Sequence, residues 1–79
     1  MTVRLSPSAL RRELAVRGIS QSDLARGAGL SEATISAAIR GHPIAARSLR
    51  RIAEYLARVP VLDVAALLQA DPLGADARR

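Results

Sequence analysis

Arginine dominates the side chains of this sequence that are able to do chemistry. All basic side chains are arginine, lysine is absent, and the formal net charge is +5. A guanidinium group binds a phosphate through a bidentate fork, so this balance favours a nucleic-acid partner. GC-rich coding would also favour arginine over lysine, but the positive charge acts on a partner under either explanation.

The same inventory gives no sign of an enzyme or of a metal site. His42 is the one histidine and there is no cysteine, whereas zinc needs three or four convergent ligands. The acidic residues are scattered over separate predicted elements, so we expect neither catalysis nor a cofactor. The sequence also shows no apolar signal core and no run of transmembrane length, which predicts a cytoplasmic protein.

The stretch Gln21–Gly41 predicts the elements that position the candidate residues, because it reads as two short helices joined by a tight turn. Ser20 can cap the first helix, with Asp23 completing a variant capping box, and Ser31 can cap the second. Gly29 suits the left-handed backbone position after a helix end. The apolar residues that would join the two helices are Leu24, Ala25, Ala28, Leu30, Ile35 and Ile39.

Further helices are expected on both sides of this pair. The predicted helices cover about Pro7–Arg17, Gln21–Ala28, Glu32–Arg40, a segment from Ala46 that Pro60 ends, and Val64–Gln69. In the first of them Leu10 and Leu14 would be buried, and the side chains expected on its solvent side are Arg11, Arg12, Glu13 and Arg17. The helix from Ala46 has no good capping side chain.

No strand is expected, and Met1–Leu5 is interpreted as a short arm. The segment His42-Pro43-Ile44 is interpreted as a loop. The fold class predicted is therefore all-α, with five short helices around one core. We expect one domain over residues 1–70 and a flexible tail over residues 71–79.

A family resemblance is carried by the segments Ser20-Gln21-x-Asp23-Leu24-Ala25, Ala28-Gly29-Leu30-Ser31 and Thr34-Ile35-Ser36, followed by Gly41. Together with Arg47–Leu56, they resemble the Cro/C1-type (Xre-like) helix-turn-helix of phage repressors and their bacterial relatives. The resemblance covers roughly Leu10–Leu68. It implies a compact lambda-repressor-like domain of five helices that binds double-stranded DNA, usually as a dimer. It also implies a sequence-specific transcriptional regulator, with repression as the favoured role.

The resemblance further implies which residues meet DNA, namely Gln21, Ser31, Glu32, Ala33, Thr34, Ser36, Ala37, Arg40, His42 and Arg47. The helix over about Glu32–Arg40 would enter the major groove. Gln21 would touch a phosphate and steady a base-reading neighbour. Arg40 and His42 would reach phosphates at the end of that helix, and Arg47 is the favoured phosphate contact from the following helix.

The sequence departs from the better-known repressors at the opening of the recognition helix, where they often carry amides that pair with adenine. Glu32 and Ala33 stand there instead. A glutamate can accept a hydrogen bond from cytosine N4, and an alanine can touch a thymine methyl group. Glu32 would equally well stabilise the N-terminal end of its helix dipole. Both interpretations of Glu32 stay open, and the operator sequence is not readable.

Two further questions stay open at this stage. The alternative function is a protein-interaction module, such as an antitoxin or an adaptor, for which the alanine-rich face of Ala33, Ala37 and Ala38 leaves room. A homodimer is expected through the surplus apolar residues of the C-terminal third, which are Val59, Val61, Leu62, Val64 and Leu68. These residues would otherwise complete the core, and Tyr55 is expected at a core edge or a dimer seam.

Overall fold

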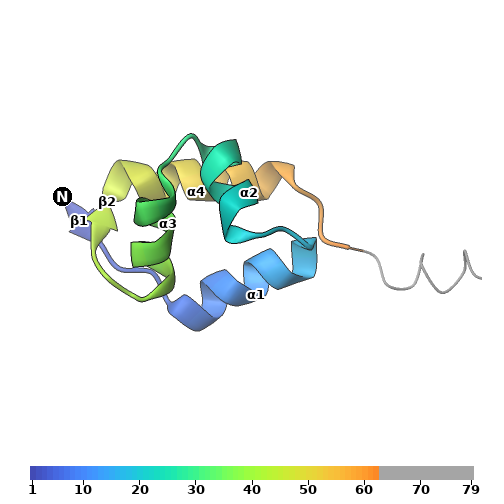
Figure 1. The fold of residues 1–79 in the computed structure, drawn as a ribbon, viewed down its shortest axis with the longest axis horizontal. Helices are drawn as coiled ribbons and strands as arrows, with labels where there is room; N and C mark the ends of the chain where they lie inside the picture. Colours follow the sequence, from blue (N-terminus) through green and yellow to red (C-terminus); the bar gives the residue numbers. More distant parts are fainter. Residues whose placement is uncertain (63–79) are drawn as a thin grey trace, which may run out of the picture.

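The computed structural model describes residues 1–62. The helices of this part are α1 (Pro7–Arg17), α2 (Gln21–Ala28), α3 (Glu32–Ile39) and α4 (Ala46–Arg58), and the strands are β1 (Thr2–Val3) and β2 (Ile44–Ala45) (Figure 1). The helical class and the helix-turn-helix pair are therefore confirmed. Four helices, not five, lie within the described part, because the fifth helix and the tail expected from the sequence fall outside it.

Helices α1 and α2 each begin at a capping serine and end at a glycine. Ser6 accepts a hydrogen bond from the Ala9 amide at the start of α1, and Ser20 and Asp23 form a reciprocal capping box at the start of α2. Gly18 and Gly29 end these two helices with φ angles of 68° and 69°. Only glycine adopts this left-handed conformation without a steric cost, so these ends are encoded locally.

The expectation of no strand was wrong. Thr2 pairs with Ala45 and Val3 with Ile44 in a two-stranded antiparallel ladder. The Ala46 amide also donates to the Met1 carbonyl oxygen at 3.1 Å, which supplies the cap that α4 does not receive from a side chain. The N-terminal arm is therefore fixed beside the segment that leads into α4 (Figure 1).

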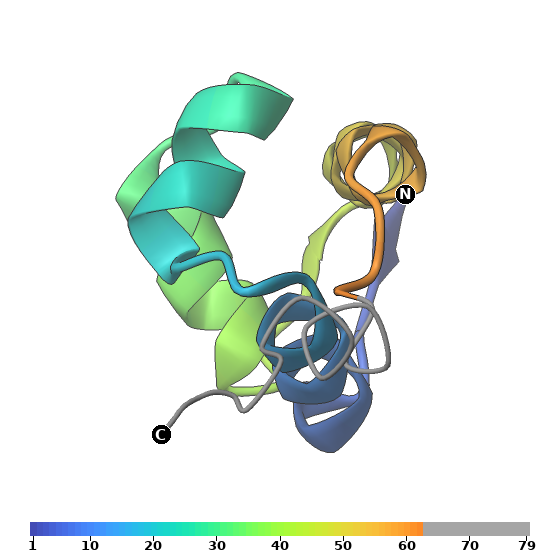
Figure 2. The ribbon, with the colours of Figure 1, turned by 90° about the vertical axis from the view of Figure 1, so that its right-hand side faces the viewer.

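The core lies between three sides of the domain. Figure 2 shows α2 and α3 on one side, α4 on the other and α1, seen nearly end-on, at the bottom. The buried apolar residues are Leu10, Leu14, Leu24, Ala25, Ala28, Ile35, Ala38, Ile39, Ile44 and Ile52. Every helix contributes to this set, so the position of α3 depends on packing against the whole domain.

Tyr55 packs at the edge of this core, as expected. Its ring lies directly against Gly27 of α2, where an added Cβ would stand 2.1 Å from Tyr55 Cε1. Since real Cβ atoms do not approach a carbon so closely, the Tyr55 ring can lie here only because residue 27 has no side chain. The sequence interpretation gave Gly27 no role in this packing.

Arg17 was expected on the solvent side of α1, and this was wrong. Its side chain is only 13% exposed. Nε donates to the carbonyl oxygens of Leu56 and Val59, both at 3.0 Å, and Nη1 pairs with Glu13. The last carbonyls of a helix lack partners within it, so this guanidinium stabilises the C-terminal end of α4.

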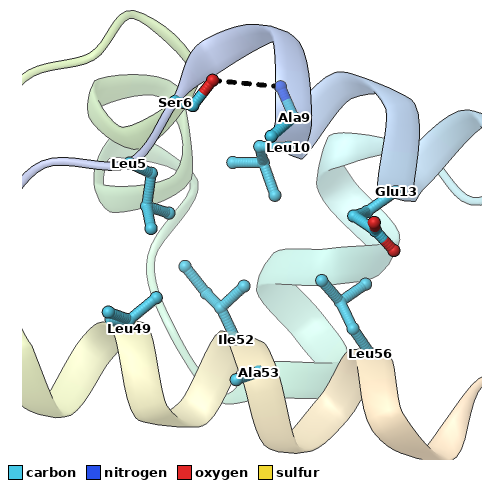
Figure 3. A pocket seen from close by; sticks show the side chains of 9 residues that line it. All are labelled: Leu5, Ser6, Ala9, Leu10, Glu13, Leu49, Ile52, Ala53 and Leu56. Carbon is cyan, nitrogen blue, oxygen red and sulfur yellow. Dashed lines mark hydrogen bonds between the residues drawn. The ribbon is translucent and has the colours of Figure 1, made fainter.

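An apolar hollow of about 170 Å³ lies between α1 and α4 (Figure 3). Leu5 and Leu10 face Leu49, Ile52 and Leu56 across it. Only Ser6 and Glu13 bring polar side chains to its lining. In the described part of the chain, no helix is long and apolar enough to cross a membrane.

Candidate nucleic-acid interface

The turn between α2 and α3 is held by hydrogen bonds. The Leu30 amide donates to the Ala25 carbonyl oxygen at 2.9 Å, which closes the C-terminal end of α2 around Gly29. From α4, Arg51 Nη1 donates to the Gly29 carbonyl oxygen at 3.3 Å. The crossing of the two helices is therefore held both by its own backbone and by a side chain of α4.

One face of α3 is locked into the core and the opposite face is not. Ile35, Ala38 and Ile39 are buried. At about 100° per residue, Ala33, Ala37 and Arg40 lie on the opposite side of this helix. Ala33 and Arg40 are exposed, and Ala37 is half-buried. Ala38 was expected on the recognition face, but it is fully buried, so the exposed alanines are Ala33 and, in part, Ala37.

The first turn of α3 uses two of the candidate hydroxyl groups for its own cap. The Ser31 hydroxyl accepts from the Thr34 amide at 3.1 Å and lies 2.9 Å from the Thr34 hydroxyl. An N-cap of this kind satisfies an otherwise unpaired amide of the helix. Both residues therefore have a structural role that fixes the opening turn of α3.

Glu32 is turned towards α2. Ser22 Oγ donates to Glu32 Oε1 at 3.3 Å, and the adjacent Gln21 is exposed at the start of α2. The carboxylate thus lies beside two helix N-termini, whose partial positive charge it complements. Sequence reasoning missed Ser22, because the contact joins residues ten positions apart and requires the crossing of α2 and α3.

The C-terminal end of α3 carries the candidate phosphate-binding side chains. Arg40 Nη1 donates to Ser36 Oγ at 2.9 Å, so this guanidinium lies along the helix. Gly41 has a φ of 77° and the His42 amide donates to the Ala37 carbonyl oxygen at 2.9 Å. The side chains of Arg40, His42 and Arg47 are all exposed. The structure therefore leaves each of them able to reach a partner.

One carboxyl group has a shifted pKa. Hydrogen bonds from the Ser20 backbone amide and hydroxyl, together with the charge of Arg26, hold the pKa of Asp23 below its ordinary value. Arg26 Nη2 lies 2.8 Å from Asp23 Oδ1. Asp23 is therefore ionised in the folded protein at neutral pH and serves the start of α2 rather than a partner.

No cluster of three or more potential metal ligands occurs among residues 1–62. The arrangement offers instead an exposed helix face with small side chains, cationic groups at its C-terminal end and a carboxylate at its N-terminal end. The candidate residues come from α2, the turn before α3, α3 itself, the segment after α3 and the start of α4.

A family model described as the Cro/C1-type HTH DNA-binding domain matches residues 9–57. The matched region begins within α1 and ends one residue before the end of α4, so it covers the whole helix-turn-helix and the helices that brace it. No curated protein and no solved structure matches the chain.

Proposed function

Because the chain belongs to the Cro/C1-type helix-turn-helix DNA-binding family, we propose that it is a sequence-specific transcriptional regulator, most simply a repressor. In this proposal α3 enters the major groove of double-stranded DNA. The observation that carries it is the two-sidedness of α3. Ile35 and Ile39 anchor one side in the core, and on the opposite side Ala33 and Arg40 are exposed and Ala37 is half-buried.

The proposed interface has residues that position the protein on the DNA backbone and residues that read the bases. Gln21, Arg40, His42 and Arg47 hold phosphates. Their exposure and their placement at the two ends of the helix-turn-helix support this role. Base edges are met by the opening turn of α3 and by Ala37. Because Ala33 and Ala37 have small side chains, the α3 backbone can approach the bases closely.

Two roles for Glu32 remain within this proposal. A contact to cytosine N4 would make it a base reader. The hydrogen bond from Ser22 favours the other role, in which the carboxylate stabilises the N-terminal ends of α2 and α3. The substitution Glu32→Ala separates them, because only a base reader changes the preference at one base pair.

The regulator is proposed to bind as a homodimer, at least on DNA, in the cytoplasm of a bacterial or phage-infected cell. Val61 and Leu62 are each 56% exposed, which supports an apolar seam in this region. The other residues named for this seam include Val64 and Leu68, which lie outside the described residues. A two-fold pair would set its recognition helices about one DNA turn apart. Sedimentation with and without DNA tests it, and a monomer on an asymmetric site would contradict it.

Selection from random duplex DNA, followed by footprinting, tests the function itself. The proposal requires enrichment of a defined sequence, protection of that sequence, and binding that weakens as salt rises, because phosphate contacts release counterions. A pool that stays random after several rounds would refute sequence-specific binding.

A protein-interaction module is the second candidate, and two observations favour it. The outward face of α3 carries alanines, and the hollow between α1 and α4 is lined almost wholly by apolar side chains (Figure 3). An antitoxin or an adaptor would bind its protein partner through such surfaces by apolar contacts and not by charged ones. Its binding would respond little to salt, which separates it from the DNA regulator.

A further inference from the structure

A second hollow, of about 320 Å³, opens beside the exposed face of α3. It is formed between α3, the segment that follows it and the first turn of α4, and its lining residues are Ala33, Thr34, Ala37, Pro43, Ile44, Ala45 and Ser48. Figure 1 shows α3 next to β2, which carries part of this lining. Ala33 and Ala37 belong both to this lining and to the outward face of α3. The hollow therefore borders the surface proposed to meet base edges.

The side chains that line the hollow are apolar except for two hydroxyl groups. The Thr34 hydroxyl already pairs with Ser31. Ser48 is different, because it is only 8% exposed and its hydroxyl takes part in none of the side-chain hydrogen bonds found within residues 1–62. A buried hydroxyl without a partner is costly, so such groups usually have a hydrogen-bonding partner. The Ser48 hydroxyl can therefore donate to an acceptor that enters the hollow.

Thymine carries the combination that this hollow would accept. In the major groove thymine presents a C5-methyl group beside the O4 acceptor, whereas cytosine presents an amino donor and no methyl group. Apolar walls suit the methyl group, and a hydroxyl donor suits O4. We propose that the hollow is a subsite for the methyl-bearing edge of a thymine, with Ala33 and Ala37 against the methyl group and Ser48 donating to O4.

This inference rests on the proposed function. Removing one methyl group from the DNA tests it independently of that function. Each thymine of the selected duplex is replaced in turn by deoxyuridine, which removes the C5-methyl group and keeps O4. We expect one position in each half-site at which the replacement weakens binding about fourfold, the value for one buried methyl-sized group. The other positions should change little.

Protein variants then locate the effect. Ala37→Gln covers the hollow with a polar amide, so binding of this variant should no longer distinguish thymine from deoxyuridine at the sensitive position. Ala33→Gln changes an exposed wall residue and serves if Ala37→Gln, at a half-buried position, fails to fold. Ala57→Gln is the matched control, because Ala57 is exposed on α4 and does not line the hollow. It should keep the fourfold difference.

The outcomes separate the two levels of the proposal. If no duplex is selected, the proposed function fails and the subsite with it. If a duplex is selected and binds in a salt-dependent way but no deoxyuridine replacement weakens it, the regulator stands and the subsite is refuted. A position that responds to a neutral methylphosphonate linkage and not to loss of the methyl group would show that the hollow receives the DNA backbone, which also overturns the inference.

Discussion

Replacing Gly29 with valine tests how the helix-turn-helix is built. Gly29 has a φ of 69°, and an added Cβ would have Arg51 Nη1, at 3.8 Å, as its nearest neighbour. An added Cβ therefore has room, and the main cost comes from the backbone conformation. A β-branched residue held in the left-handed region costs roughly 1–3 kcal/mol. In a domain of this size 1 kcal/mol lowers the melting temperature by about 4–8 °C.

Gly29→Val should therefore lower the melting temperature by roughly 5–20 °C in a thermal unfolding experiment. Gly29→Asn is the matched control, because asparagine tolerates the left-handed conformation and should retain most of the stability. If both variants melt together with the wild type, the turn does not impose a positive φ and the account of α2 ending at this residue is wrong.

The remaining predictions concern single side chains. Arg17→Met should destabilise the fold by about 1–3 kcal/mol in chemical unfolding, because the α4 carbonyls lose a partly buried charged donor; wild-type stability would refute the cap. Arg40→Ala should weaken binding to all duplexes alike and reduce the salt slope by about one unit, whereas a change at one base pair would make it a reader. If Glu32 reads a base, Glu32→Ala should shift the preference at one base pair by roughly 1–3 kcal/mol, and a flat profile leaves it the helix-end role. The lowered pKa of Asp23 gives stability that is present above about pH 4 and lost as pH falls through the folded-state pKa; Asp23→Asn should remove that part of the acid slope.

The features predicted well from the sequence are those that neighbouring residues determine. Ser20 with Asp23, Ser31 with Thr34, and the positive φ of Gly29 each involve at most four consecutive residues. Their hydrogen bonds form within one helical turn, so the residue types specify them without knowledge of the fold.

The features that were missed require the packed domain. Arg17 turns inward because the end of α4 lies beside it, although the carbonyls it binds are 39 and 42 residues further along the chain. The β1–β2 ladder joins two-residue strands, which are too short to show an alternating pattern. Ser48 is buried beside a hollow that α3, β2 and the start of α4 line together. Contacts of this kind depend on how the helices cross.

The salt dependence of binding to the selected duplex tests the central claim most directly. If Arg40 and Arg47 each neutralise one phosphate, log affinity should fall against log salt concentration with a slope of about −2 for each domain bound. A scrambled duplex should show a similar slope at much lower affinity, because the phosphate contacts are shared and the base contacts are not. Wild-type binding that does not change with salt, or that does not distinguish the two duplexes, would contradict a sequence-specific DNA-binding regulator.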